Sequence, residues 1–246
     1  MKKIVLSLIL GFGFLFGTQE INVYTYHNHA PFITDKKVGL SYDLIDHLNK
    51  NANGKYIFIL KVIPRNRLNY TLKPWINKKC GVTKKCASNW MVLWVNPKWG
   101  FGKDSMSNFA WTSLFEDSNI IISSKQNHIE YSSPHSLIGK KLAGISGHKY
   151  VGIDELVNQG KITRINGNNE TLNLKKVLSS RVDVTLLPNS SFKYYQKKDI
   201  SLHDLKGSNT AHQRYMRNIM TTTKNTELID FLQSQNFTTI LKEYAK

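Results

Sequence analysis

Short stretches of the chain alternate apolar and polar residues in the pattern of β-strands. Residues 20–26 begin this alternation with Ile21 and Val23 and end in aromatic residues, which predicts a strand. Pro31 excludes a helix in the loop that follows. Residues 55–63 alternate or run apolar in the same way, and they predict a second strand.

An amphipathic helix is predicted between these two strands. Its apolar face is formed by residues at helical spacing, namely Leu44, Ile45 and Leu48. Ser41 is the expected N-cap, and Gly54 is the expected stop. A strand, a helix and a strand in this order predict a β-α-β unit with two parallel strands.

A second α/β region follows further along the chain. Residues 141–146, 163–165 and 182–187 predict strands. Apolar residues at helical spacing separate these strands and predict two helices, with faces formed by Ile153, Leu156, Val157, Leu174, Val177 and Leu178. The two regions are separate α/β units and not sequence repeats.

The first residues predict an export signal. Lys2 and Lys3 precede an apolar run over residues 4–16 that is too short and too glycine-rich for a permanent membrane span. We expect a signal peptide over residues 1–17, cleaved near Gly17, and a periplasmic protein. No later run is long and apolar enough for a second span, so stable membrane insertion is not expected. About 229 residues remain, which suffices for two lobes with separate cores.

The chain is strongly basic. Its formal net charge is +17, and loss of Lys2 and Lys3 with the signal leaves +15. A basic solvated surface explains this charge, and a cleft that attracts anionic ligands is the alternative. A nucleic-acid partner is disfavoured, because the chain carries an export signal and its lysines are scattered without a nucleic-acid motif.

The chain has two cysteines, Cys80 and Cys86. In an oxidising compartment an isolated pair at this spacing predicts a local disulfide, which stabilises by about 2 to 3 kcal/mol. A metal site needs further ligands, and no His, Asp or Glu lies between or beside the pair. The spacing also differs from the Cys-x-x-Cys of redox proteins.

Four short motifs occur in a defined order along the chain. They are residues 29–32 (HAPF), 39–44 (GLSYDL), 142–147 (LAGISG) and 180–184 (SRVDV). In this order the chain resembles the extracellular solute-binding protein family 3. These type II, two-lobed periplasmic binding proteins are best known from polar amino acid uptake by ABC transporters.

The resemblance implies an α/β fold of two lobes, each a mixed sheet flanked by helices, joined by two hinge crossings. Lobe 1 is expected to comprise residues 18–115 plus 212–246, and lobe 2 residues 116–211. The hinge crossings fall near residues 114–118 and 205–213. It further implies a monomer that closes on a small-molecule ligand and, as a possible partner, an ABC transporter permease.

The chain departs from the family at the amino acid clamp. Amino acid binders carry an Arg shortly after the strand that here covers residues 91–97, and its fork grips the α-carboxylate. This chain has no Arg between Arg67 and Arg164. The family's acidic residue for the ammonium group corresponds to Pro188 and Asn189. A standard α-amino acid is therefore disfavoured, and a small anionic or carboxylated solute is expected.

The expected ligand-binding residues lie in loops and at strand ends that face the presumed cleft: Tyr26, His29, Arg65, Trp94, Asn96, His148 and Lys149. Trp94 and Asn96 end a strand, where open α/β sheets place ligands. His29 matches the position that covers the ligand in the family. Residues 147–150 match a turn at a helix start, which is a site for anions.

Each of these assignments has a structural alternative. The alternative for Trp94 is a core residue, and the alternative for His29 is a loop histidine bonded to backbone. Arg65 supplies a guanidinium to the cleft or lies in a solvated first helical turn. Lys149 contacts an anionic ligand or points to solvent.

No enzyme motif is present. The chain lacks a Gly-x-Ser-x-Gly elbow, a His-Glu-x-x-His pair, a P-loop and a dinucleotide fingerprint. No catalytic residue, cofactor or metal site is predicted, although His27 and His29 alternate and have the spacing to supply two metal ligands. The same fold hosts cyclohexadienyl dehydratase-like lyases, so a lyase is the alternative function.

Overall fold

The structure is a computed structural model, and it describes residues 17–81, 85–102 and 104–242. The signal peptide predicted over residues 1–17 lies outside the described residues apart from Gly17. The elements follow in chain order as β1 (Gln19–Thr25), α1 (Leu40–Asn51), β2 (Tyr56–Val62), α2 (Arg65–Ile76), β3 (Trp90–Val95), α3 (Ser105–Asn108), β4 (Phe109–Ser124), η1 (Pro134–Leu137), β5 (Lys141–Ile145), α4 (Ile153–Asn158), β6 (Thr163–Gly167), α5 (Glu170–Leu178), β7 (Val184–Pro188), α6 (Asn189–Lys198), η2 (Ile200–Asp204), β8 (Leu205–Gly207), β9 (Gln213–Thr222), α7 (Thr226–Gln233) and α8 (Thr238–Leu241).

The strands form one mixed sheet that runs through both lobes. Its strand order is β2-β1-β3-β9-β4-β7-β5-β6, and β8 pairs with β4. β1 is parallel to β2 and β3, and β5 is parallel to β6 and β7. β4 and β9 are antiparallel to each other and to their neighbours β3, β7 and β8. The predicted β-α-β unit is therefore present as β1-α1-β2.

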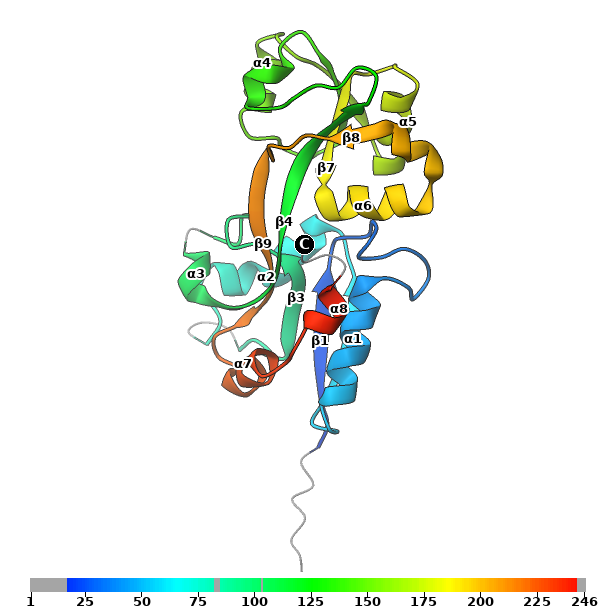
Figure 1. The fold of residues 1–246 in the computed structure, drawn as a ribbon. Coiled ribbons are helices and arrows are strands. Elements are labelled where there is room, and N and C mark those ends of the chain that lie inside the picture. The colour runs from blue at the N-terminus through cyan, green and yellow to red at the C-terminus, as the bar shows by residue number, and fades with distance from the viewer. Residues whose placement is uncertain (1–16, 82–84, 103, 243–246) are drawn as a thin grey trace, which may run out of the picture.

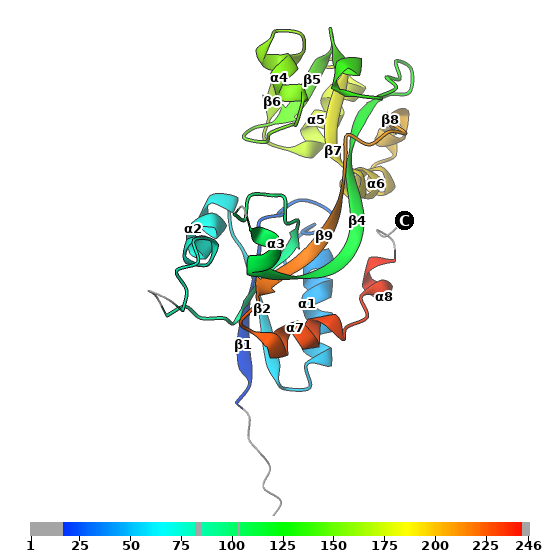
Figure 2. The same ribbon diagram turned by 90° about the vertical axis from the view of Figure 1, so that its left-hand side faces the viewer.

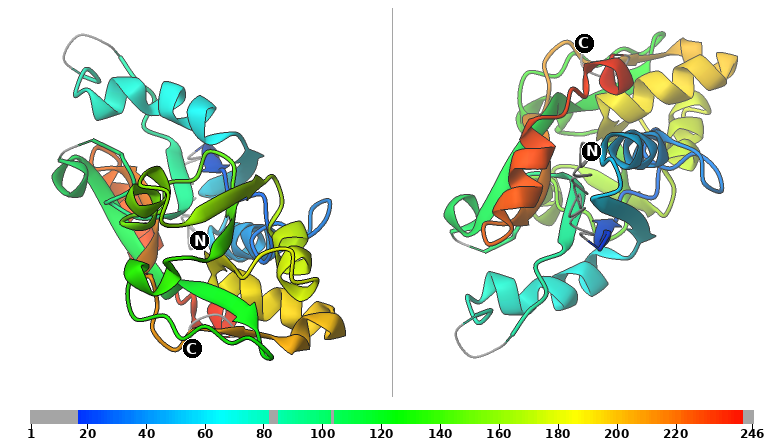
Figure 3. Two further views of the ribbon diagram at one scale, coloured as in Figure 1. Left: turned by 90° about the horizontal axis from the view of Figure 1, so that it is seen from above. Right: turned by 90° about the horizontal axis from the view of Figure 1, so that it is seen from below.

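Two lobes are visible in Figure 1, and the long strands β4 and β9 run between them. In lobe 1, α1, α7 and α8 cover one face of the strands, while α2 packs on the other face (Figures 2 and 3). In lobe 2, α5 and α6 pack on one face and α4 on the other. Each lobe thus has a hydrophobic cluster on either side of its strands, as a layered α/β domain requires.

The chain crosses between the lobes in β4 and β9. Their pairing extends from Phe109 opposite Thr222 to Asn119 opposite Gln213, and its register shifts between Ser113 and Phe115. The first predicted crossing, residues 114–118, lies directly after this shift. The second crossing is β9 itself and the residues before it. The exact residue bounds of the two lobes stay a prediction.

The predicted cap of α1 is wrong. The N-cap is Gly39, and Ser41 lies inside the helix, where its hydroxyl accepts a hydrogen bond from the Trp94 indole nitrogen (2.9 Å). Ser41 is fully buried, so its hydroxyl is committed to the core of lobe 1. A buried donor such as an indole N–H needs a partner, and Ser41 provides it.

The predicted disulfide is present between Cys80 and Cys86. It closes a loop between α2 and β3. The Lys224 ammonium group, after β9, donates a hydrogen bond to the carbonyl of Cys80 (2.9 Å). The loop is thus tied to lobe 1 by a covalent bond and by a polar contact. Across the described residues, no helix has the length and apolar character needed to cross a membrane.

Candidate functional site: the cleft between the lobes

The loop after β1 carries aromatic side chains to the carboxyl end of the strand. It covers residues 26–32 (YHNHAPF) and is held against α1, where the N–H of Ser41 donates to the carbonyl of Phe32 (3.0 Å). Gly39 permits this close approach, because a Cβ at its position would lie 2.7 Å from the Phe32 carbonyl oxygen. The loop therefore sits where open α/β sheets place their ligands.

Arg65 begins α2 and reaches into the same region. Its guanidinium donates to the Tyr26 hydroxyl (2.8 Å), to the Asn69 side chain (2.9 Å) and to the carbonyl of Trp99. The guanidinium carbon lies 4.8 Å from the Tyr26 ring centroid and 4.3 Å from that of Phe101. Arg65 is half-buried, and it joins α2, the loop after β1 and the loop after β3.

A buried ion pair lies at the base of the cleft. Arg217 of β9 donates through Nε to Asp117 Oδ2 of β4 (2.7 Å), and the two side chains are 1% and 2% exposed. The hydroxyl of Ser190, at the start of α6, donates to the same carboxylate oxygen (2.7 Å). Arg217 also donates to the carbonyl of Trp94 (3.2 Å) and to the Tyr215 hydroxyl (3.3 Å). This network connects both lobes with both crossing strands.

Aromatic rings enclose the buried guanidinium. The Arg217 guanidinium carbon lies 4.5 Å from the ring centroid of Phe32, 5.2 Å from that of Tyr215 and 5.7 Å from that of Trp99. Ring faces attract cations, and this attraction is strongest where water is excluded. The rings thus help to offset the cost of burying the charge.

The two lobes touch directly on one side of the cleft. The hydroxyl of Ser191 in α6 donates to the carbonyl of Ala30 in lobe 1 (2.7 Å). His29 Nδ1 lies 3.6 Å from Glu170 Oε2, and the Tyr195 hydroxyl donates to this same oxygen (3.2 Å). These contacts hold Glu170, in the first turn of α5, against the loop that follows β1.

A cavity of about 370 Å³ opens beside these contacts. Both lobes line it, with His29, Asn28 and Thr34 from lobe 1 and His148, Glu170 and Tyr195 from lobe 2 among the contributors. Its size suits a small solute. A ligand in this cavity touches both lobes at once, which is the condition for ligand-driven closure.

Burial shifts the pKa of several ionisable groups in the cleft. The His27 pKa is well below its ordinary value because the ring is buried, and the nearby Arg217 and His29 lower it further. The His148 pKa is lowered mainly by burial too. Burial raises the pKa of the Glu170 carboxyl, while His29 opposes this shift. His27 is thus neutral near pH 7.

Two of the predicted ligand-binding residues, His29 and His148, line the cavity between the lobes, and two others, Tyr26 and Arg65, pair with each other in lobe 1. They come from the loop after β1, from α2 and from the turn after β5, which are remote from one another in the sequence. Their contact with a ligand stays a proposal.

Trp94 and Asn96 are placed differently from the prediction. The Trp94 side chain is fully buried in the core of lobe 1, against Phe32 at a centroid distance of 5.0 Å, so it does not cover a ligand. Its backbone serves the site instead, because its carbonyl accepts a hydrogen bond from Arg217. Trp94 has a φ of 65° and lies at a register shift in β3. Asn96 is buried, donates to the Met216 carbonyl (2.9 Å) and accepts from the N–H of Lys98 (3.0 Å).

The turn predicted over residues 147–150 does precede a helix, but these residues do not form the helix N-terminus that the anion site requires. α4 begins at Ile153, so His148 and Lys149 lie in the turn before it. Arg164 fixes this turn by donating to the carbonyls of Ile145 (2.9 Å) and His148 (2.9 Å). Lys149 is exposed and does not line the cavity, so no helix N-terminus presents it to an anion.

Three charged residues of the cleft were missed from the sequence: Arg217, Asp117 and Glu170. A signal existed for Arg217, because it falls between the aromatic Tyr215 and the apolar Ile219 in the period-2 pattern of β9. Glu170 follows the end of β6 in the first turn of a helix, another position that faces ligands in α/β sheets. Asp117 had no such signal, since Glu116 and Ser118 beside it are polar as well.

Among the described residues, no group of three or more His, Cys, Asp or Glu side chains is arranged to hold a metal ion. His27 Nδ1 does lie 3.4 Å from His29 Nε2. His29 engages Glu170 and Ser191 through its other nitrogen. The two histidines therefore belong to the hydrogen-bonded network of the cleft.

No family model matches the chain, and no curated protein matches its sequence. Solved structures do match. An arginine-binding protein from T. maritima has a TM-score of 0.57 at 16% identity, with 91% of this chain and 88% of that chain covered. An ancestral arginine-binding protein bound to arginine has a TM-score of 0.62 at 16% identity, with 94% and 100% covered.

A third structure is described as an ancestral amino acid-binding protein and a precursor of cyclohexadienyl dehydratase. Its TM-score is 0.58 at 15% identity, with 92% of this chain and 96% of that chain covered. At such identities the likeness shows the fold. The chain therefore has the two-lobed fold of periplasmic binding proteins, which is the fold that the sequence resemblance implied.

Changing Asp117 to Asn should lower the free energy of unfolding by about 3 to 5 kcal/mol, because it leaves the Arg217 charge buried without its partner. Urea unfolding followed by tryptophan fluorescence measures this loss. The control is Glu227→Gln in the exposed pair with Lys55, where no measurable change is expected. An Asp117→Asn variant as stable as the wild type would refute the structural role of the pair.

Stability should fall as the pH drops below about 6.5, because the unfolded chain binds a proton at His27 that the folded protein does not. A single such group contributes at most about 1.4 kcal/mol per pH unit, and its contribution ends once the pH is below the folded pKa. His27→Gln should give a shallower slope in urea titrations, while the exposed His203→Gln should keep the wild-type slope. Equal slopes in both variants would contradict a buried neutral His27.

Proposed function

We propose that this protein is a periplasmic solute-binding protein. It captures a small solute with a carboxylate or another anionic group in the cleft between its lobes, for ABC-type uptake or sensing. The observation that carries this proposal is the Arg65 guanidinium, which bonds to the loop after β1 in lobe 1 and retains unused donors. A monomer that delivers its solute to a transporter permease fits this role.

Arg65 is suited to hold an anion. A guanidinium has five N–H donors in a planar fork, and three of them bind Tyr26, Asn69 and Trp99. The remaining donors match the two oxygens of a carboxylate. The three protein contacts hold the fork in place before a ligand arrives, which lowers the entropy cost of binding.

Aromatic rings beside Arg65 supply the surface for an apolar or flat part of the solute. The Tyr26 ring contacts the guanidinium, which also donates to the backbone carbonyl of Trp99. The Trp99 ring lies 4.9 Å from that of Tyr215 in an edge-to-face arrangement. Trp99 thus takes the part that the sequence assigned to Trp94. The solute we propose has an anionic group at Arg65 and an apolar part at these rings.

Lobe 2 contributes the closing contacts. His148 and Glu170 line the cavity opposite the loop after β1. A solute that reaches both Arg65 and these residues gains contacts only in the closed state, and the difference in binding free energy drives closure. Uptake systems of this fold use such closure to present a loaded protein to a partner.

A lyase on the same fold is the second candidate. It is favoured by Glu170, because burial raises the pKa of its carboxyl, as is common for catalytic acids and bases. One structural neighbour is also described as a precursor of cyclohexadienyl dehydratase. Turnover of the bound solute by pure protein, lost on Glu170→Gln, would move the assignment to this lyase.

The ligand can be identified by mass spectrometry of molecules that co-purify with the protein, followed by calorimetry on related compounds. Arg65→Gln should weaken the affinity for the anionic ligand at least tenfold, because losing a buried charged hydrogen bond costs about 2 to 5 kcal/mol. Arg67→Gln is the matched control, since Arg67 is exposed in the same helical turn and should leave the affinity unchanged.

Circular dichroism checks that both variants are folded. Two outcomes would contradict the proposal. In one, neutral sugars bind better than anionic compounds. In the other, Arg65→Gln and Arg67→Gln have the same affinity as the wild type.

A further inference from the structure

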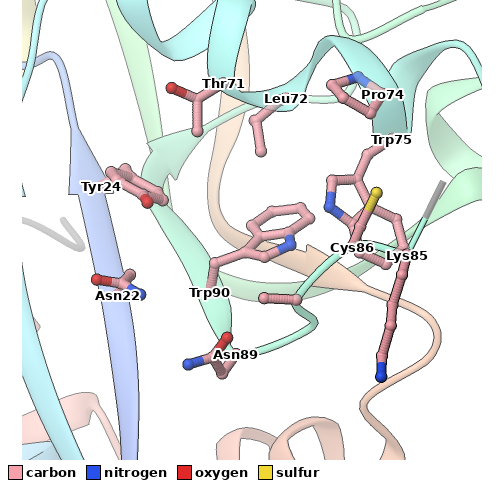
Figure 4. A pocket seen from close by; sticks show the side chains of 11 residues that line it. Asn22, Tyr24, Thr71, Leu72, Pro74, Trp75, Lys85, Cys86, Asn89 and Trp90 are labelled. Carbon is pink, nitrogen blue, oxygen red and sulfur yellow. The ribbon is translucent and has the colours of Figure 1, made fainter. Parts of the chain in front are cut away.

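A second cavity lies outside the cleft, in lobe 1. It measures about 290 Å³ and is bounded by α2, β1, the start of β3 and the loop closed by the disulfide (Figure 4). The residues that line it include Tyr24, Leu72, Pro74, Trp75, Lys85 and Trp90. Nothing in the proposed solute-binding role uses this cavity.

Two indole rings meet at this cavity, and one of them has a buried N–H group without an acceptor. The Trp90 side chain is 5% exposed, and its buried Nε1 has no hydrogen-bond partner. Trp75 is half-buried beside it. The two ring centroids are 5.8 Å apart, and Figure 4 shows the nitrogen edges of both indoles turned toward each other. Buried donors are normally paired, so the arrangement calls for an acceptor.

One carboxylate can satisfy both donors. An indole N–H only donates, whereas an ionised carboxylate only accepts and has two oxygens to offer. A hydrogen bond from a neutral donor to a charged acceptor is stronger than one between neutral groups. Two N–H groups on adjacent, tilted rings therefore favour an anionic acceptor over a neutral carbonyl.

The charges around the cavity point the same way. Lys85 lines it, and no Asp or Glu is among its described lining residues. The Lys224 ammonium nitrogen lies 5.9 Å from the Trp75 ring centroid, while it donates to the carbonyl of Cys80. Both nearby cations raise the local concentration of anions.

The remaining walls suit an aromatic body. Tyr24, Leu72 and Pro74 add ring and aliphatic surface to the two indoles. A cavity of about 150 Å³ lined by apolar side chains holds benzene. The larger volume here leaves room for one ring with a polar substituent.

The disulfide fixes one wall of this cavity. Cys86 lines it directly, and its bond to Cys80 closes the loop that carries Lys85. The contact from Lys224 to Cys80 joins this loop to the end of β9.

We propose that this cavity is a second ligand site of the protein, distinct from the cleft between the lobes. It takes a small aromatic carboxylate. The carboxylate accepts from the indole N–H groups of Trp75 and Trp90, and the ring packs against Tyr24 and Leu72. The site stands independently of the solute that the cleft binds.

Benzoate is the probe, and nuclear magnetic resonance of the indole N–H groups is the readout. In the ¹⁵N-labelled protein, the Trp75 and Trp90 signals should move progressively on addition of benzoate. Trp94 and Trp111 are internal controls, because their N–H groups are bonded to Ser41 and to the Ser105 carbonyl. The neutral isostere benzamide should shift the Trp75 and Trp90 signals far less.

Trp75→Phe keeps an aromatic ring but removes one donor, and it should weaken the affinity for benzoate about tenfold. Trp111→Phe is the matched control and should leave benzoate affinity unchanged. Unmoved Trp75 and Trp90 signals in the wild type, or equal affinity for benzamide and benzoate, would overturn the proposal. A shift of Trp99 alone would place benzoate in the cleft and also overturn it.

Discussion

The buried pair of Arg217 and Asp117 is the interaction on which the two-lobed structure depends. Each charge is removed almost entirely from water, which costs several kcal/mol unless the partner and hydrogen bonds compensate. Asp117 receives Arg217, the Ser190 hydroxyl and two backbone N–H groups. Because these partners come from β4, β9 and α6, the pair defines how lobe 2 meets the crossing strands.

The long strands around this pair explain how a cleft can open and close. β4 and β9 are paired as far as Asn119 and Gln213, beyond which β4 pairs with β7 and β8, while the parallel strands end separately in each lobe. Loops at those ends carry Arg65 and Tyr26 on one side and Glu170 and His148 on the other. We expect bending of the two strands to change the distance between these loops without breaking either core. Hinge motions of this kind leave packed layers intact.

Much of the fold was predictable because its elements follow local rules. β1, α1 and β5 fall within a residue or two of their predicted ranges, since each has a clear apolar period. Trp94 was misplaced because a strand end predicts proximity to a ligand but not which way a side chain points. The shift of register in β3 turns its indole into the core and its carbonyl toward Arg217.

The charged part of the cleft was less accessible from the sequence. At the clamp positions known from amino acid binders, this chain has no Arg and no acidic residue, which indicated a cleft without that clamp. Tertiary structure brings Arg217, Asp117 and Glu170 to the cleft from other elements. Arg217 pairs with Asp117 over about 100 residues of sequence separation. A pair so distant in the sequence leaves no periodic pattern, so only the packing of the lobes reveals it.

The central claim is that a solute is held between two lobes that close on it. Small-angle X-ray scattering on protein stripped of ligand and then saturated with its co-purified solute tests this claim most directly. The account predicts a smaller radius of gyration in the loaded protein, with unchanged mass. Superimposable scattering curves for the stripped and loaded protein, with binding confirmed by calorimetry, would contradict it.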